Sequence, residues 1–438
     1  MRQRWPAAAT ILAWQIWTKC SKAAFKPTVR ILYVVHQFYP KFCSGTERFV
    51  LNLASSLQRD RHFAEVVTYD LFNTDRFQSR NQLSTREYIY KNIPVLAMRH
   101  KTMPIDVHTS CEDSEIYHFA LAFLQNRERY DVLHCAHPMR LTSFLKAARE
   151  LGLPYILTLT DFWFICPKIF LQTSSGTLCS GPEGGEVCGK LCPELPSRGI
   201  ADRLKTAKEI LSNAKAVIAP SRFLAALFKK EFPGLKISLI RHGMDSGSLK
   251  QNTRTYKRGD EIVFGYAGGL APHKGVHLLL KAFRELEAAS AKLKVYGSYS
   301  HEMEYSQVLR KIAELDKRIE FCGSYKPAEV GNILQGIDVL VVPSVVYESY
   351  SLALHEALAC NIPVIAADIG AASEEITNST NGFLFRAGDE NELKRKLQDI
   401  TEQPEILNEI KKNLDQHNPT LVEEEAFMYE RLYNNSRE

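Results

Sequence analysis

Two carboxylates in the C-terminal half of the chain have a spacing that suits a ligand rich in hydroxyl groups. Glu348 and Glu356 lie in VVPSVVYESYSLALHEALACNIPVIAAD, residues 341–368, with seven residues between them. An apolar strand is expected before them and another after them. The pattern places Glu348 in a loop and Glu356 inside the following helix. A carboxylate has two acceptor oxygens and can bind both hydroxyls of a diol, whereas a solvated helix face is the competing interpretation.

A cation and a glycine-rich loop lie earlier in the chain, in YAGGLAPHKGVHLLL. A strand is expected to end before Gly268 and Gly269, and Lys274 comes just before the next helix. Glycines let backbone amides approach a phosphate, and a helix N-terminus favours an anion. The spacing is neither that of a P-loop nor G-x-G-x-x-G. A phosphate site and an ordinary turn with a surface lysine therefore both stay open.

Four of the ten cysteines fall in one segment that also contains glycine and proline. Four thiolates that include a C-x3-C pair could form a tetrahedral zinc site. Two disulfides in an oxidising compartment and four free thiols are the alternatives. The prediction is a structural Zn²⁺ bound by Cys166, Cys179, Cys188 and Cys192.

The elements that must position these residues alternate along the chain from Val29 onward. Short apolar strands such as VRILYVV, DVLHCA and YILTLT are separated by amphipathic helices such as TERFVLNLASSL. The same order recurs after residue 240, with strands at EIVFGYA, KLKVYG, DVLVVPS and IPVIAAD. Alternating strands and helices predict parallel α/β sheets, here two doubly wound Rossmann-like domains. Ligands bind such sheets at the carboxyl ends of the strands, so facing domains would share one cleft.

The predicted organisation has four parts. Residues 1–28 form an extension, for which a disordered tail, an interfacial segment and a weak signal sequence are the alternatives. Residues 29–240 form the N-terminal domain with a cysteine-rich insertion at 166–192, and residues 241–415 form the C-terminal domain. Residues 416–438 read as a helix that packs back on the domains, because its apolar residues recur at helical spacing.

Several of these stretches together resemble one family. GGL and KG around Lys274, the E-x7-E pair, the following Asn-Ile-Pro, and DIGAASEEITNSTNGFLF look like the retaining GT-B glycosyltransferases of the glycosyltransferase family 4 type. HQFYPKFCSGTERFVLNLASSL, DVLHCAHP, TLTDFWFICP and AVIAPSRF fall in the family's order in the first half. The resemblance extends over residues 29–433 and implies a GT-B fold with an acceptor domain followed by a nucleotide-sugar domain.

The resemblance implies an activity and a set of roles. The activity is transfer of a sugar from a UDP- or GDP-sugar to a hydroxyl of a glycan or lipid-linked glycan, as in polysaccharide synthesis, with retention and without a metal or other cofactor. Lys274 would bind the diphosphate and Glu348 the donor sugar. The remaining donor-binding residues would be Gly45, Gly268 and Gly269 through loop backbone, Ser351 and Leu352 through amides at the distal phosphate, and Glu356 at the ribose diol. His137, at a strand end, together with Thr160 and Asp161, would line the acceptor or sugar side.

Two positions depart from the family pattern. Gly269 stands where the family commonly has an arginine, and Thr160 stands where it commonly has a histidine. Compensation by Arg241 or His242 would preserve activity. The alternative is an inactive nucleotide-sugar-binding or scaffold protein.

Charge completes these expectations. The chain has a net charge of +5, but residues 1–240 carry 32 Lys and Arg against 20 Asp and Glu. A basic N-terminal half favours acidic partners. We therefore expect a cytoplasmic protein that contacts a membrane peripherally, and we expect no nucleic acid partner. The competing interpretation is that these basic residues only keep the surface of the domain solvated.

Overall fold

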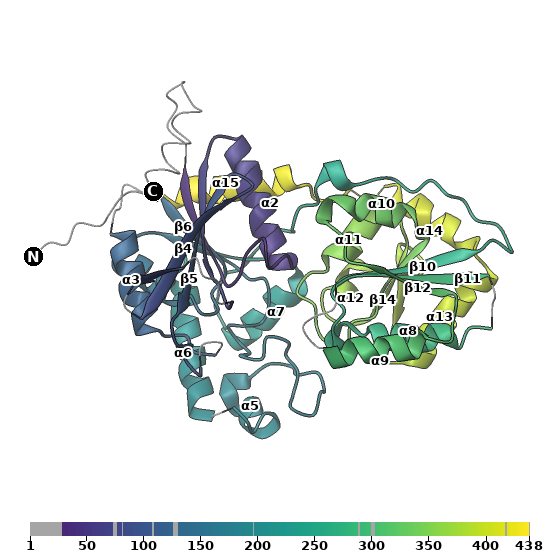
Figure 1. Cartoon of the computed structure of the whole chain (residues 1–438), viewed down its shortest axis with the longest axis horizontal. Helices are drawn as coiled ribbons and strands as arrows, with labels where there is room; N and C mark the ends of the chain where they lie inside the picture. The colour runs from purple at the N-terminus through teal and green to yellow at the C-terminus, as the bar shows by residue number, and fades with distance from the viewer. Residues whose placement is uncertain are drawn as a thin grey trace, which may run out of the picture.

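The computed structural model describes residues 29–437 apart from 73–76, 81, 107–108, 126–129, 196, 288–289, 299–302 and 417. It has two lobes, and each lobe is an α/β unit around its own sheet (Figure 1). The predicted extension at residues 1–28 lies outside the described residues. Among the helices of the described part, none has the length and apolar character needed to cross a bilayer.

The N-terminal lobe is built on a nine-stranded sheet in the order β3-β4-β5-β2-β1-β6-β7-β8-β9. Neighbours from β5 to β9 pair in parallel. These strands are β1 Arg30–Val35, β2 Phe63–Tyr69, β5 Ile93–His100, β6 Val132–His137, β7 Tyr155–Thr158, β8 Ala216–Ala219 and β9 Ser238–Leu239. The helices are α2 Gly45–Arg59, α3 Ser114–Leu124, α4 Ser143–Glu150, α5 Glu186–Leu191, α6 Ser197–Asn213 and α7 Arg222–Glu231.

An antiparallel edge on this sheet was not among the expected strands. It consists of β3 Gln78–Arg80 and β4 Leu83–Tyr90, and β4 pairs with β5 along its length. The β4–β5 turn has Lys91 at φ 46° and Asn92 at φ 66°. Two consecutive positive φ values define a type I′ turn, whose twist matches that of a hairpin.

The C-terminal lobe is built on six parallel strands in the order β12-β11-β10-β13-β14-β15. The strands are β10 Ile262–Ala267, β11 Ala291–Tyr296, β12 Ile319–Gly323, β13 Val339–Val342, β14 Val364–Ala367 and β15 Gly382–Phe385. The helices are α8 Val276–Arg284, α9 Met303–Ala313, α10 Val330–Gln335, α11 Leu352–Ala359, α12 Ala372–Glu375, α13 Glu390–Glu402 and α14 Ile406–Leu414. The strand order reverses between β10 and β13, which is where such sheets bind ligands. The predicted pair of doubly wound α/β units is therefore confirmed.

The last helix, α15 Val422–Ser436, lies on the N-terminal lobe although it follows the C-terminal one (Figure 1). Tyr429 and Tyr433 are fully buried in the N-terminal core. Tyr433 Oη lies 2.7 Å from Nδ1 of His134, and Tyr429 Oη lies 2.7 Å from Oγ1 of Thr158. Burial, with a repulsive contribution from His242, lowers the pKa of His134 to about 3. His134 is thus a neutral structural histidine that joins α15 to the sheet.

Replacing Tyr433 with Phe should destabilise the N-terminal lobe by about 1–3 kcal/mol, because His134 Nδ1 would lose a buried hydrogen-bond partner. Urea unfolding of the full chain measures this change. Phe427→Ala is the control on the same helix, since Phe427 is 59% exposed, and it should change stability by less than about 0.5 kcal/mol. Equal effects of the two substitutions would contradict the account of the network.

Candidate functional site

The loops after β10 and β13 bring the predicted cation and the first carboxylate together. Lys274 Nζ lies 2.8 Å from Oε1 of Glu348, although the two residues are 74 positions apart. Gly275 has φ 69°, and a Cβ at that position would lie 1.9 Å from the carbonyl oxygen of Pro343. Only glycine fits this close approach of the two loops. The KG pair therefore places the ammonium group beside the end of β13.

Glu348 is held as a charged group. Burial by itself raises the pKa of Glu348, but Lys274 and the hydroxyls of Ser344 and Ser351 outweigh burial, so that this pKa lies below its usual value. The backbone is fixed as well, because the Ala371 amide donates to the Glu348 carbonyl over 3.1 Å. The side chain is 13% exposed, so a ligand in the cleft can still reach it.

Two helix N-termini from different lobes lie next to each other near this ion pair. Helix α2 begins at Gly45 and helix α11 begins at Leu352. A Cβ on Gly45 would lie only 3.6 Å from Cδ1 of Leu352. Ser351 takes the N-cap position of α11 but makes no capping hydrogen bond with its side chain. The start of α11 lies beside the Lys274–Glu348 pair, because Ser351 contacts the Glu348 carboxylate, and the start of α2 lies next to it. Helix N-termini favour an anion such as a diphosphate.

Glu356 has a partner that the sequence did not indicate. It is 2% exposed and forms an ion pair with Arg48 of α2, so the contact joins the two lobes. Burial raises the pKa of Glu356, and the guanidinium of Arg48 offsets part of that rise. The solvated-face interpretation of Glu356 is wrong. Its predicted role at a ribose diol stays a prediction, and that role would require Arg48 to share or release the carboxylate.

The strand ends of the N-terminal lobe carry a second polar cluster. His137 and Asp161 form a hydrogen bond at the ends of β6 and β7. The ring of His36, which follows β1, lies 3.9 Å from that of His137. Burial, His137 and Arg140 lower the pKa of His36 well below its usual value, so His36 is neutral. His36 and Arg140 were missed, although the position of His36 at the end of the first strand was a usable signal.

The side chain of Thr160, at the position where the family commonly has a histidine, is hydrogen-bonded within its own lobe. Its Oγ1 donates to the Ala136 carbonyl over 2.8 Å, within its own lobe. Its backbone carbonyl accepts a hydrogen bond from Ser349 of the opposite lobe. Ser221 Oγ donates to the Ser349 carbonyl over 2.7 Å. The loop that contains Glu348 is thus fastened to the N-terminal lobe by hydroxyl groups.

The loop after β10 gives no steric reason for a glycine at position 269, where the family commonly has an arginine. Gly268 is closely packed, because a Cβ there would lie 2.9 Å from the hydroxyl oxygen of Tyr266. A Cβ on Gly269 would meet no atom within 4 Å, so an arginine there would fit. The expected substitutes are engaged elsewhere: Arg241 Nη2 lies 2.8 Å from Oε1 of Glu375, and His242 Nδ1 lies 3.0 Å from Oε1 of Glu425.

The cysteine-rich insertion lies against the same loop. The ring of Phe170 stacks on that of His273, next to Lys274, with 4.4 Å between ring centroids. The thiols of Cys166, Cys179, Cys188 and Cys192 are buried and unpaired, so the disulfide alternative finds no counterpart here. Within the described ranges, no three or more His, Cys, Asp or Glu side chains are grouped so that they could hold a metal ion. The structure therefore gives the zinc prediction no support.

Comparison with protein families matches both lobes. Residues 250–417 match the family described as glycosyl transferases group 1, and residues 43–247 match the one described as glycosyltransferase family 4. Together the matches include Gly45, Lys274 and both glutamates of the cleft.

Among similar proteins, a lipopolysaccharide 1,2-N-acetylglucosaminetransferase of Salmonella typhimurium is 29% identical over 189 residues. That alignment covers 40% of this chain and 50% of the relative, so the chain spans only half of that protein's length. An uncharacterized glycosyltransferase of Methanocaldococcus jannaschii is 25% identical over 372 residues, which are 81% of this chain and 84% of the relative.

Solved structures share the fold. HepE of Anabaena in complex with UDP and glucose has a TM-score of 0.65 and 19% identity, covering 93% of this chain and 99% of that one. Sucrose-phosphate synthase of Thermosynechococcus elongatus has a TM-score of 0.67 and 17% identity, covering 92% and 98%. Both support the GT-B arrangement of two Rossmann-like units.

Removal of Arg48 should leave the buried carboxylate of Glu356 without its partner. We expect Arg48→Met to destabilise the protein by about 3 kcal/mol at pH 8. The loss should shrink toward pH 5, because the raised pKa of Glu356 lets the folded state take up a proton that the unfolded state still lacks. Urea unfolding at several pH values measures both effects.

The double variant Arg48→Met, Glu356→Gln should recover much of the lost stability, since no buried charge remains. Arg59→Met on the same helix is the control, because its ion pair with Glu423 is about 60% exposed on both sides and should contribute less than about 1 kcal/mol. A pH-independent loss in Arg48→Met would refute the buried-charge explanation.

Proposed function

The chain belongs to the glycosyltransferases of group 1, of the family 4 type, and we propose that it moves a hexose from a nucleoside diphosphate sugar to a hydroxyl of a glycan or lipid-linked glycan, with retention. The observation that carries this proposal is the Lys274–Glu348 ion pair beside the two helix N-termini. A cation and backbone amides suit a diphosphate, and an ionised carboxylate suits the hydroxyls of the attached sugar.

In the proposed reaction the acceptor hydroxyl attacks the anomeric carbon on the face that the diphosphate leaves. The bond between this carbon and the phosphate oxygen breaks, and its electron pair stays on the diphosphate. The acceptor proton passes to the departing phosphate oxygen. Lys274 and the helix amides stabilise the growing negative charge, which is the step at which preorganised dipoles lower a barrier most. These groups supply the charge that the step requires, so we propose that the transfer uses no cofactor.

Donor binding would rearrange the Arg48–Glu356 pair. A ribose diol at Glu356 would take over its acceptor oxygens. The released guanidinium of Arg48 lies one turn inside α2, whose N-terminus faces the diphosphate. We propose that Arg48 supplies the positive charge that Gly269 lacks. This reading favours an active enzyme over the scaffold alternative, which none of the named relatives supports.

Loss of the cation should abolish most of the activity. We expect Lys274→Ala to lower kcat/KM by about 10²–10³-fold with the fold intact, because stabilisation of the leaving group is lost. The assay is hydrolysis and transfer with a panel of UDP- and GDP-sugars. Lys292→Ala is the matched control, since Lys292 pairs with Glu261 on the exposed surface of the same lobe. Unchanged activity in Lys274→Ala would refute this assignment. Binding of UDP or GDP without turnover of any donor would favour the scaffold alternative.

The stereochemical outcome is a separate test. Proton NMR of the freshly formed product should show the anomeric configuration of the donor sugar, because attack and departure occur on one face. Inversion at the anomeric carbon would exclude the proposed step but leave the donor site unaffected.

A further inference from the structure

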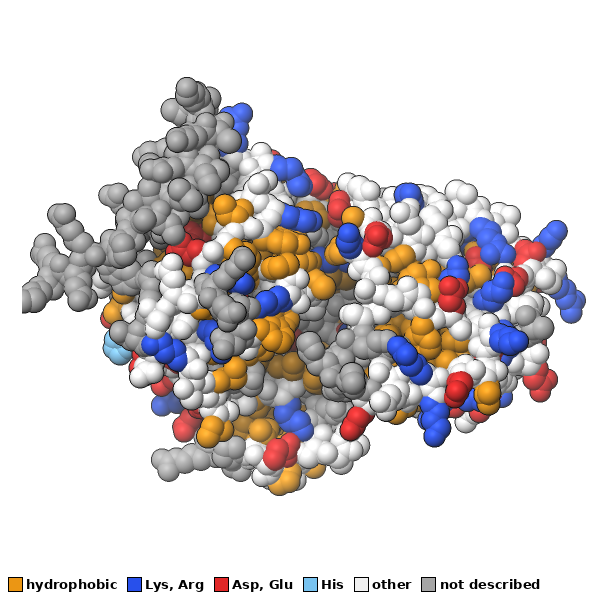
Figure 2. Space-filling view, in the orientation of Figure 1, with side chains coloured by type: hydrophobic (Ala, Val, Ile, Leu, Met, Phe, Trp, Pro, Cys, Tyr) orange, Lys and Arg blue, Asp and Glu red, His pale blue; other side chains and the backbone are white. Residues whose placement is uncertain are grey.

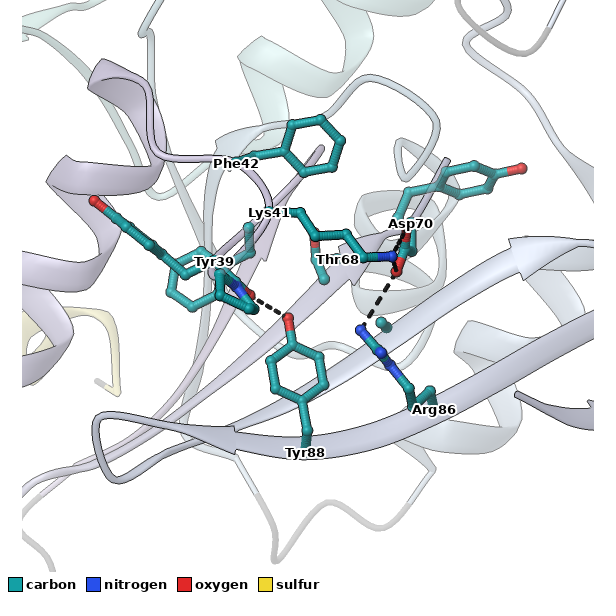
Figure 3. A pocket seen from close by; sticks show the side chains of 11 residues that line it. Tyr39, Lys41, Phe42, Thr68, Asp70, Arg86 and Tyr88 are labelled. Carbon is teal, nitrogen blue, oxygen red and sulfur yellow. Dashed lines mark hydrogen bonds and ion pairs between the residues drawn. The ribbon is translucent and has the colours of Figure 1, made fainter. Parts of the chain in front are cut away.

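A small hollow lies in the N-terminal lobe, apart from the Lys274 loop. The loop after β1, the end of β2 and the missed strand β4 enclose it, and Lys41, Thr68, Asp70, Arg86 and Tyr88 are among its lining residues (Figure 3). The hollow is small and partly open to solvent, far below the size of sites that enclose a drug-sized ligand. It has room for one small group, such as a carboxylate or hydroxyl, of a ligand whose ring lies across the opening.

Charged groups converge inside this pocket. Lys41 Nζ lies 3.1 Å from Oδ2 of Asp70, and Arg86 Nη2 lies 3.4 Å from the same oxygen (Figure 3). The Asp70 side chain is 7% exposed, while those of Lys41 and Arg86 are 28% and 20% exposed. The carboxylate is therefore fixed and the two cations can reach a ligand. With two cations for one carboxylate, these three residues leave one positive charge for an anion.

Polar atoms without a partner also line the pocket. Thr68 is 2% exposed, and neither its Oγ1 nor the buried Nε of Arg86 has a hydrogen-bond partner in the structure. Buried polar groups are nearly always paired, so such exceptions call for an explanation. A ligand with hydroxyl and acidic groups would pair both atoms.

Aromatic rings hold the cations in place. The Arg86 guanidinium lies 4.8 Å from the ring centroid of Tyr88 and 5.4 Å from that of Phe77. Lys41 Nζ lies 5.2 Å from the ring centroid of Phe72, which is 40% exposed. Lys and Arg side chains also lie among hydrophobic ones on this lobe in Figure 2. Apolar faces next to charged groups suit a sugar ring, which has both characters.

The pocket lies within reach of the donor site. Lys41 precedes Gly45, where α2 meets α11, by four residues, and four residues span at most about 14 Å. The same loop thus borders both sites. A bound ring at Lys41 could therefore place a neighbouring sugar of the same chain in the cleft.

We propose that this pocket binds an acidic sugar of the acceptor, one bearing a carboxylate or phosphate, with Lys41 and Arg86 binding its acidic group and Asp70 its ring hydroxyls. The proposal rests on the proposed function, because it assigns the acceptor side of that reaction. It would explain part of the positive charge of the N-terminal half as a site for the acidic group of the acceptor.

Binding of two small probes to the full chain tests it. Methyl glucuronide and methyl glucoside differ in a carboxylate, and saturation-transfer NMR titration compares their affinities. We expect the glucuronide to bind at least about tenfold more tightly, and Lys41→Ala and Arg86→Gln each to reduce this preference by about tenfold, as for charge-assisted hydrogen bonds. Asp70→Asn should weaken both sugars. Lys394→Ala, which removes a partly exposed ion-paired lysine from the other lobe, should change neither.

Thermal unfolding checks that each variant is folded. If Asp70→Asn does not fold, the comparison rests on Lys41→Ala. Equal affinities for the two sugars, no binding of either, or variants that bind like the unmodified chain would overturn the proposal. Donor hydrolysis is measured on the same samples. Hydrolysis without sugar binding overturns the pocket assignment alone. Glucuronide binding with no turnover of any donor supports the pocket assignment and counts against the proposed function.

Discussion

The buried ion pair between Arg48 and Glu356 is the contact around which the cleft is organised. Arg48 lies near the start of α2 and Glu356 in the middle of α11, and these helices come from different lobes. Neither charge is stable in a dry interior without the other. The pair therefore requires the strand ends of one sheet to face those of the other. The approach of Gly45 to Leu352 and the hydroxyl contacts of Ser349 follow from this arrangement.

Within the cleft, the two glutamates have opposite electrostatic settings although they are close in sequence. Glu348 has a lysine and two hydroxyls around it, so its charged form is favoured. Glu356 is dominated by burial, so its charge depends on Arg48. The first carboxylate stays ionised, as its proposed contact with sugar hydroxyls requires. The carboxylate of Glu356 is bound by Arg48, which a ligand would have to displace.

The alternation of strands and helices was enough to predict both sheets, because most of the parallel strands are buried apolar runs that the sequence shows directly. The β3–β4 edge was missed because half of β4 faces solvent and reads as polar, and its turn at Lys91 and Asn92 lacks a glycine. In the site, Lys274 and Glu348 could be found from local spacing. Arg48 could not, because its function depends on a contact across 308 residues that no local pattern records. The cysteine spacing suggested a metal site, for which the described part of the insertion gives no support.

The chain passes between the lobes twice, and the two passages are bonded to each other. Met244 and Leu421 form a parallel bridge, the Met244 amide donates to the Thr420 carbonyl over 2.8 Å, and a Cβ on Gly243 would lie 2.5 Å from Val422. The N-terminal core includes side chains from α15, which is synthesised after the strands of both lobes. During translation the C-terminal lobe, whose strands are contiguous in the chain, can finish folding first. The N-terminal lobe is synthesised before the C-terminal one, yet its core is complete only when Tyr429 and Tyr433 pack into it.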